Sequence, residues 1–190
     1  MLLSSVGGAG WLKYQDVSTG DLVAELRTGK GRCSCLRQNP TNAVLHCGHG
    51  NGTVTLWSPT VQTPLVSLLA HRGPVLNMAI DTGGHYMVST GLDGYAKCWD
   101  LRMFRMLHAY TTLRPAQGLD ISQTGLLAVG HGSHVQVWKD ALQSKQKSPY
   151  LNHEMPGKQC ADLRFCPFED VLGCGHSDGF SSVVVPGMIP

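Results

Sequence analysis

The chain has 190 residues, of which 42% are hydrophobic and 15% are charged, with a formal net charge of +2 at pH 7. This length supports one domain with a sizeable core, and so small a net charge gives no compositional argument for nucleic-acid binding. No apolar run approaches the roughly 20 residues of a membrane span, so we expect no membrane partner. The first six residues also lack the basic segment of a signal peptide.

The first 26 residues predict a hairpin followed by an outer strand. Strands are expected at 2–6 and 11–17, joined by a turn that ends at Ala9 and Gly10, and a third strand is expected at 22–26. Because residue 1 already lies next to the first of these strands, we expect this unit to be partial.

A second unit extends from Cys33 to Leu69. Pro40 and Asn42 mark one turn, and the pair Asn51 and Gly52 marks the next. The strands around these turns are expected at 43–47, 53–57 and 66–69.

The third unit is the best formed, with strands expected at 75–80, 86–90, 95–99 and 106–110. Asp93 and Gly94 form its central turn, which we predict to be type I′, with positive φ at both residues. Alternation along the following strand puts Trp99 on one face and Cys98 on the other.

Two weaker units follow. Strands are expected at 118–121, 126–129 and 134–138, then a polar basic connection at 139–149, then strands at 160–165, 171–174 and 180–185. In each unit, a strand follows the hairpin turn. The end positions compared for these strands are Gln15, Trp57, Trp99, Trp138 and Val184, which are 42, 42, 39 and 46 residues apart.

A repeat of roughly 40–45 residues that ends in Trp-Asp is the signature of WD repeats, each of which forms one blade of a β-propeller. Closed propellers have roughly 4–8 blades. We therefore predict an all-β fold, a WD40-type β-propeller in the form of an incomplete arc of about four to five blades. We expect propeller blades at 1–148, the first one partial, and a further blade that begins a truncated C-terminal region at 149–190.

The best repeat resembles the hydrogen-bonded tetrad of WD blades. His71, Ser89, Asp93 and Trp99 occupy the matching positions, and a Trp–Ser–His–Asp chain satisfies every buried polar group in it. The tetrad is degraded in the other repeats. Asn51 replaces the Asp, Gly29 stands near the His position, and Gln15 and Val184 replace the Trp.

Seven cysteines and nine histidines raise the question of zinc. The cysteines form no Cys-x-x-Cys pair and several alternate with apolar residues, so we expect reduced, buried thiols, no metal and no cofactor. Gly-His dipeptides recur at 48–49, 130–131 and 175–176. They suggest either a row of imidazoles that binds a metal or an anion, or turn residues bonded to local backbone, and we favour the second.

Two segments are rich in basic residues: Arg27, Lys30, Arg32 and Arg37 in the first, and Lys139, Lys145 and Lys147 in the second. We regard them as candidate contacts to RNA or to a partner, with ordinary solvated loops as the alternative. The stretch 28–31 lacks the spacing of a phosphate-binding loop. No nucleophile elbow, carboxylate pair or cofactor fingerprint is present, so we expect no catalytic residues, no small-molecule substrate and no enzyme activity.

The resemblance is sharpest in the stretch 38–59 and in two later stretches: Arg164-Phe-Cys-Pro-Phe-Glu-Asp-Val-Leu-Gly173 and Gly175-His-Ser-Asp-Gly-Phe-Ser-Ser-Val-Val-Val-Pro-Gly187. They resemble the nucleolar WD-repeat family of the small-subunit processome, which accompanies U3 small nucleolar RNA (snoRNA) in early 18S ribosomal RNA maturation. The resemblance covers 2–187, whereas 188–190 depart from the family's continuation.

This resemblance implies a non-catalytic scaffold in the nucleolus. Its implied partners are processome proteins, precursor ribosomal RNA (pre-rRNA) and U3 snoRNA. Since most propellers are interaction platforms, a generic WD-repeat protein-interaction module, such as a peptide reader or a ligase substrate receptor, is the alternative. That alternative predicts an acidic or aromatic pocket at the mouth of the central channel.

Overall fold

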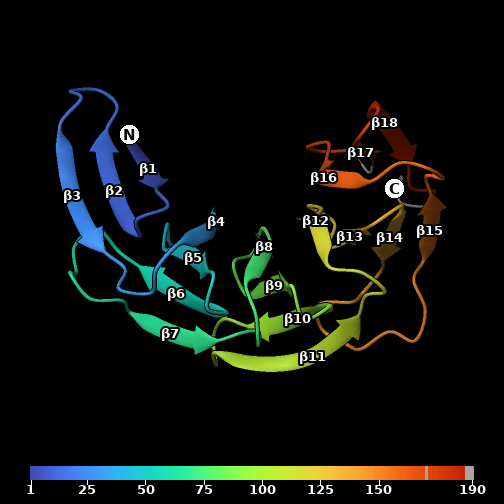
Figure 1. Cartoon of the computed structure of the whole chain (residues 1–190), viewed down its shortest axis with the longest axis horizontal. Coiled ribbons are helices and arrows are strands. Elements are labelled where there is room, and N and C mark those ends of the chain that lie inside the picture. The colour runs from blue at the N-terminus through green and yellow to red at the C-terminus, as the bar shows by residue number, and fades with distance from the viewer. Residues whose placement is uncertain (170, 187–190) are drawn as a thin grey trace.

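The computed structural model describes residues 1–169 and 171–186, which form eighteen β-strands in five antiparallel sheets (Figure 1). The first three strands form one sheet, β1 (Leu2–Val6), β2 (Trp11–Asp16) and β3 (Leu22–Arg27). The second sheet contains β4 (Cys33–Gln38), β5 (Leu45–His49), β6 (Thr53–Trp57) and β7 (Val66–Leu69). Within these described ranges, no helix is long and apolar enough to cross a membrane.

The remaining three sheets follow in chain order. The third contains β8 (Val75–Ile80), β9 (Tyr86–Gly91), β10 (Tyr95–Asp100) and β11 (Arg105–Thr111). The fourth contains β12 (Ala116–Ile121), β13 (Leu127–His131), β14 (His134–Trp138) and β15 (Leu151–Glu154). The fifth contains β16 (Cys160–Phe165), β17 (Val171–His176) and β18 (Gly179–Val184).

The five sheets lie side by side along an arc, as the blades of a propeller do (Figure 1). The strands β4, β8, β12 and β16 face the hollow, and β3, β7, β11 and β15 run along the outside. The first and the fifth sheet lie on opposite sides of an open gap. The prediction of an all-β, incomplete propeller of four to five blades is confirmed, with three four-stranded and two three-stranded sheets.

Four hydrophobic cores hold the arc together, one between each pair of neighbouring sheets. In chain order, the cores bring together Leu12 with Trp57, Val54 with Met78, Cys98 with Leu127, and Val137 with Leu163. Because successive side chains on a strand point to opposite faces, each middle sheet contributes to two cores. Burial at about 25 cal/mol per Å² of apolar surface makes these contacts the main stabilising force.

The cysteines follow this pattern with two exceptions. Five are buried, Cys35 is half-buried and Cys166 is exposed, so the expectation that all seven are buried is wrong. Cys166 lies in the connection after β16, outside the sheet interfaces that bury the others.

The central turns also differ from the prediction. Gly94 has a φ of +74°, but Asp93 is not among the described non-glycine residues with positive φ, so type I′ is wrong. The amide of Gly94 donates to the carbonyl of Gly91 at 3.3 Å. This is a three-residue loop, a type I turn followed by a left-handed glycine, and Gly52 with φ +83° repeats it in the second sheet.

Two strands, β4 and β15, have no counterpart in the prediction. β15 pairs antiparallel with β14, with Leu151 opposite Val137 and Glu154 opposite His134. The fourth sheet therefore extends past position 148. The departure from the family at 188–190 lies outside the described residues.

Candidate functional site

The third sheet contains a continuous chain of four hydrogen-bonded side chains. The indole Nε1 of Trp99 donates to Ser89 Oγ at 3.0 Å, and Ser89 Oγ lies 2.9 Å from His71 Nε2. At the other end, His71 Nδ1 lies 2.9 Å from Asp93 Oδ1. His71 and Ser89 are 1% and 0% exposed, so every polar group in the chain needs a partner, and each has one.

The hydrogen bonds through His71 have a definite direction of donation. Since the carboxylate only accepts, His71 donates from Nδ1 to Asp93 and accepts at Nε2 from the Ser89 hydroxyl. Burial lowers the pKa of His71, which keeps the ring neutral near pH 7. Burial alone would raise the pKa of Asp93, but His71 and the Arg72 amide bring it below its ordinary value.

The second sheet makes a shorter chain from different positions. Trp57 Nε1 donates to Thr55 Oγ1 at 2.8 Å, and Thr55 Oγ1 lies 2.7 Å from His49 Nε2. No carboxylate completes it, because the position of Asp93 is taken by Asn51. The Asn51 side chain accepts instead from the amide of Thr53 at 3.1 Å, which fixes the turn.

Two histidines of the Gly-His dipeptides, His49 and His131, take the place of His71 in the second and fourth sheets. His49 and His131 end the second strand of their sheets and are 0% and 1% exposed. The expectation that they bond to local backbone is wrong for these two residues. It holds for His176, whose Nδ1 accepts from the Asp178 amide at 3.3 Å.

The glycines of these dipeptides allow neighbouring strands to approach closely. A Cβ at Gly48 would lie 2.5 Å from Cys35 Sγ and 2.9 Å from a methyl carbon of Val75 in the third sheet. A Cβ at Gly130 would lie 2.5 Å from Cys160 Sγ in the fifth sheet. The repeat is therefore a packing motif: the glycine contacts the next blade and the histidine fills its own.

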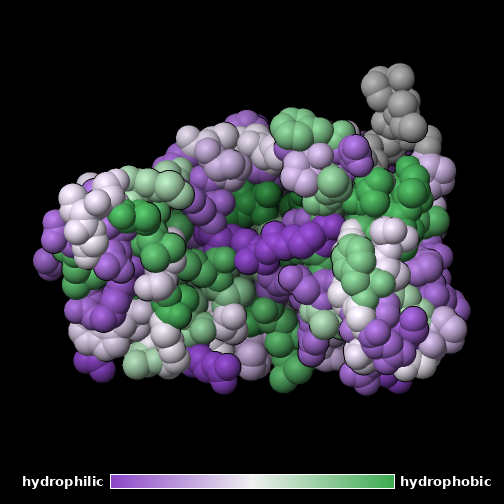
Figure 2. Space-filling view, turned by 90° about the horizontal axis from the view of Figure 1, so that it is seen from above, coloured by the Kyte–Doolittle hydropathy of each residue, from purple (hydrophilic) through white to green (hydrophobic). Residues whose placement is uncertain are grey.

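Polar side chains on the inner strands connect neighbouring blades along the wall of the hollow. Arg37 donates to Asn77 Oδ1 at 3.0 Å, and Asn77 Nδ2 donates to the carbonyl of Gln117 at 2.9 Å. Further along, the guanidinium of Arg164 lies 3.8 Å from the carboxylate of Asp120. Burial raises the pKa of Asp120. A view into the open side of the arc shows a hydrophilic band across the hollow (Figure 2). Arg37 is thus part of the wall between blades.

The connections between strands lie on two opposite faces of the arc. We call one the turn face, formed by the hairpin turns 7–10, 50–52, 92–94, 132–133 and 177–178 and the between-blade connections 28–32, 70–74, 112–115 and 155–159. We call the other the loop face, formed by 17–21, 39–44, 58–65, 81–85, 101–104, 122–126, 139–150 and 166–169. Antiparallel order requires this division, since successive strands reverse direction.

The seven basic candidates do not form one surface. Lys30 and Arg32 lie on the turn face. Arg27 ends β3, with its guanidinium 6.0 Å from the centre of the Trp11 ring. The second basic segment, which contains Lys139, Lys145 and Lys147, lies on the loop face, where Lys139 Nζ is 5.9 Å from the centre of the Tyr150 ring.

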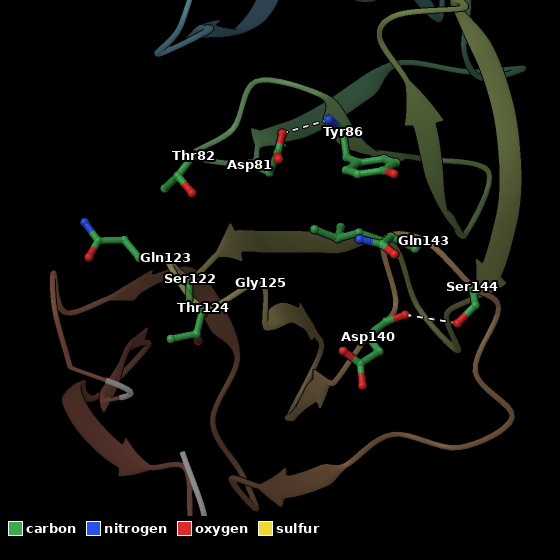
Figure 3. A pocket seen from close by; sticks show the side chains of 11 residues that line it. Asp81, Thr82, Tyr86, Ser122, Gln123, Thr124, Gly125, Asp140, Gln143 and Ser144 are labelled. Carbon is green, nitrogen blue, oxygen red and sulfur yellow. Dashed lines mark hydrogen bonds between the residues drawn. The ribbon is translucent and has the colours of Figure 1, made fainter. Parts of the chain in front are cut away.

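A polar cavity of about 390 Å³ opens on the loop face between the third and fourth sheets (Figure 3). Asp81 and Tyr86 line one side, and Gln123, Asp140 and Ser144 line the other. Asp81 Oδ1 accepts from the Tyr86 amide at 2.7 Å, which fixes this carboxylate. No single segment of the sequence predicts this cavity, because its walls come from separate blades.

Two protein families match parts of the chain. Residues 62–100 match the WD domain, G-beta repeat, and this range contains all four residues of the complete tetrad. Residues 149–188 match the BING4CT (NUC141) domain.

Proteins of several organisms resemble nearly the whole chain. U3 small nucleolar RNA-associated protein 7 of Saccharomyces cerevisiae is 49% identical over 98% of this chain and 36% of its own length. WD repeat-containing protein 46 is 47% identical in Mus musculus and 45% in Homo sapiens, over 98% of this chain and 30% and 31% of those proteins. The chain thus spans about a third of the length of the curated relatives it matches.

Solved structures share the fold at low sequence identity. A chain in the crystal structure of the mitotic checkpoint complex superposes with a TM-score of 0.81 and 20% identity, over 98% of this chain and 63% of that one. A computationally designed protein, Ika8, gives 0.82 and 18%, over 97% and 55%. These likenesses show the propeller fold alone. The sequence relatives, the WD repeat and the BING4CT domain together show that the chain belongs to the WD-repeat family of U3 small nucleolar RNA-associated protein 7 and WD repeat-containing protein 46.

Proposed function

We propose that this protein is a non-catalytic scaffold of the small-subunit processome, acting in early 18S ribosomal RNA processing and 40S ribosome biogenesis. The observation that carries the proposal is the 49% identity, over 98% of this chain, to a yeast protein named for its association with U3 snoRNA. Its partners would be processome proteins, pre-rRNA and U3 snoRNA, and its place of action the nucleolus.

A purely structural use of the buried polar groups supports a role without catalysis. The His71 chain satisfies its own members, and the Arg37 and Asp120 contacts join neighbouring blades. Groups engaged in this way hold the arc together and leave no free nucleophile–base pair among them. A rigid arc with two open faces is suited to holding components together.

The two faces let the scaffold meet two partners at once. The candidate contacts on the turn face are Lys30 and Arg32, and those on the loop face are Lys139, Lys145 and Lys147. Arg27 and Arg37, the other two candidates, have aromatic and inter-blade contacts of their own. We also retain the proposal of propeller blades at 1–148 and a family-specific region from 149, which then begins inside the fourth blade.

A generic protein-interaction module is the second candidate. The cavity between the third and fourth sheets favours it, since Asp81, Asp140 and Tyr86 offer two carboxylates and an aromatic ring at one opening. Such a site fits a basic peptide. This function predicts that Asp81→Asn abolishes partner binding while ribosomal RNA maturation is unaffected.

Depletion and replacement in cells test the scaffold function. Loss of the protein should cause precursors of 18S ribosomal RNA to accumulate while large-subunit ribosomal RNA still matures, and the wild-type protein should restore processing. Tyr95→Ala, at an exposed position, serves as a control variant that should restore it equally. Normal 18S maturation after depletion would overturn the proposal.

A further inference from the structure

Every between-blade connection on the turn face carries at least one basic residue. The first holds two, and the next three hold one each; in chain order they are Lys30, Arg32, Arg72, Arg114 and Lys158. We call these five residues the basic track. Four are exposed and Lys158 is half-buried. None of them takes part in an ion pair within the described parts of the chain.

Hydrogen bonds hold the backbone of the first two connections in place. The carbonyl of Arg32 accepts from the Gly50 amide at 3.0 Å, which ties the connection to the hairpin turn of the same blade. The amide of Arg72 donates to Asp93 Oδ2 at 3.3 Å. The tetrad of the third blade therefore also anchors a track residue.

The other two connections are also tied to hairpin turns. In the third connection, the amide of Thr112 donates to the carbonyl of Gly94 at 2.9 Å. The aliphatic stem of Arg114 lies over Gly132, where a Cβ would be 2.9 Å from Arg114 Cδ. Beside Lys158, the carbonyl of Gln159 accepts from the Ser177 amide at 3.1 Å. All four connections thus present cationic side chains from an ordered backbone.

The two faces differ in their balance of charge. The turn face holds two described carboxylates beside the five track residues. Asp93 is hydrogen-bonded to His71, whereas Asp178 is not. On the loop face, the described connections hold four basic and four acidic residues: Arg102, Lys139, Lys145 and Lys147, with Asp21, Asp81, Asp140 and Glu169. The positive potential is therefore concentrated on the turn face, although the net charge of the chain is only +2.

Further blades, or a partner seated in the gap of the arc, would cover sheet edges and flat sheet surfaces. The turn face lies at the ends of the strands, so the track remains open to a ligand in either case. Stacked sheets lie about 10 Å apart, and equivalent connections recur around the arc at about that interval. A flexible polyanion can follow such a row.

We propose that the basic track binds the sugar–phosphate backbone of single-stranded RNA, along a path that crosses all four connections; this rests on the scaffold function proposed above. Lysine and arginine heads that contact successive phosphates release counterions and need no particular base. The track contains no aromatic side chain, so it lacks a stacking platform for bases. Binding should therefore be tolerant of sequence and steeply dependent on salt.

Purified protein and a fluorescent uridine homopolymer test the track by anisotropy at several salt concentrations. One variant combines Lys30→Gln, Arg32→Gln, Arg72→Gln, Arg114→Gln and Lys158→Gln. The control carries Lys13→Gln and Arg105→Gln, at two exposed basic residues of β2 and β11 that belong to neither the track nor the loop-face candidates. Exposed changes of this kind alter stability by less than about 0.5 kcal/mol each, and thermal unfolding confirms that both variants fold.

The track variant should lose affinity on the order of 100-fold at low salt. Its slope of log affinity against log salt should shrink by up to about 3.5, at about 0.7 for each lost phosphate contact, while the control keeps both values. Equal losses in the two variants, or no loss in the track variant, would overturn the track.

Recovery of U3 snoRNA with the tagged protein separates this proposal from the scaffold function. If the track variant binds the homopolymer as wild type does while U3 snoRNA is still recovered, the track is wrong and the scaffold stands. If the track variant loses the homopolymer but wild type recovers no U3 snoRNA, the track stands and the scaffold is wrong.

Discussion

His49 and His71 fill equivalent places in neighbouring blades, although they come from different strand positions. His49 lies opposite Cys33, the first residue of β4, and its counterpart opposite the first residue of β8 is Gly91. A Cβ at Gly91 would lie 2.5 Å from the ring of His71. Each of these two blades therefore has room for one histidine, supplied in the third blade from the preceding connection and in the second from the end of the second strand.

Replacing the indole of the complete tetrad should be severely destabilising. Trp99 is 6% exposed, and Trp99→Ala removes its packing and leaves Ser89 without its indole donor. The expected loss is on the order of 3–5 kcal/mol of unfolding free energy, a large part of the stability of a small domain. Denaturant titration measures it, with Tyr95→Ala on the same strand as an exposed control. Unchanged stability in Trp99→Ala would contradict the structural role of the tetrad.

The glycine of the Gly-His dipeptide should not tolerate a methyl group. Gly130→Ala places a Cβ 2.5 Å from Cys160 Sγ and 3.0 Å from Leu163, which forces the fourth and fifth blades apart. Overpacking of this kind typically costs about 1–3 kcal/mol. Gly50→Ala is the control, since its nearest neighbour is the Arg32 carbonyl at 3.8 Å. Equal melting temperatures for the two variants would argue against close packing at Gly130.

Acid should weaken the fold through its buried histidines. Burial lowers the pKa of His46 to about 4, and it also lowers the pKa values of His49 and His131. Since unfolded histidine has a pKa near 6.5, the unfolded chain binds more protons below that pH, and stability falls as the pH drops from about 6.5 to 4. His46 alone should account for about 3 kcal/mol over this range.

Unfolding free energies measured between pH 7 and pH 4 check this sign. His46→Leu should flatten the dependence by about one proton. A wild type that gains stability on acidification would contradict the assignment of neutral, buried histidines.

Thiol labelling should distinguish the cysteines by location. In the native protein a maleimide should react rapidly at Cys166, the exposed cysteine, and slowly at the five buried ones. Burial raises the pKa of Cys98 to about 12, which slows its reaction further. In denaturant all seven should react. Mass spectrometry of labelled peptides reads the order, and a Cys166→Ser variant should abolish the fast phase.

Local sequence patterns were sufficient for most of the fold. The hairpin that ends at Trp99 is readable because turn residues and alternation are both local, and its strand β10 matches the expected segment to within one residue. β15 was missed because Leu151–Glu154 is short and contains no β-branched residue. Its identity as a strand depends on pairing with β14, which is a tertiary contact.

The candidate site was less predictable, for the same physical reason. The positions of His71 and Trp99 follow from the repeat. The role of His49 does not, because it depends on Gly29, in a different segment, standing where the third blade has His71. The separation of Lys30 from Lys139 onto opposite faces follows only from strand direction. The type I′ prediction failed because a glycine at position 94 is compatible with either turn, and the hairpin has a three-residue loop.

Recovery of U3 snoRNA with the tagged protein from nuclear extract is the most direct test of the scaffold function. We predict enrichment of U3 snoRNA and of 18S precursors over an unrelated small nucleolar RNA, and loss of that enrichment in Trp99→Ala. Recovery of U3 snoRNA no greater than that of the unrelated RNA would contradict the account.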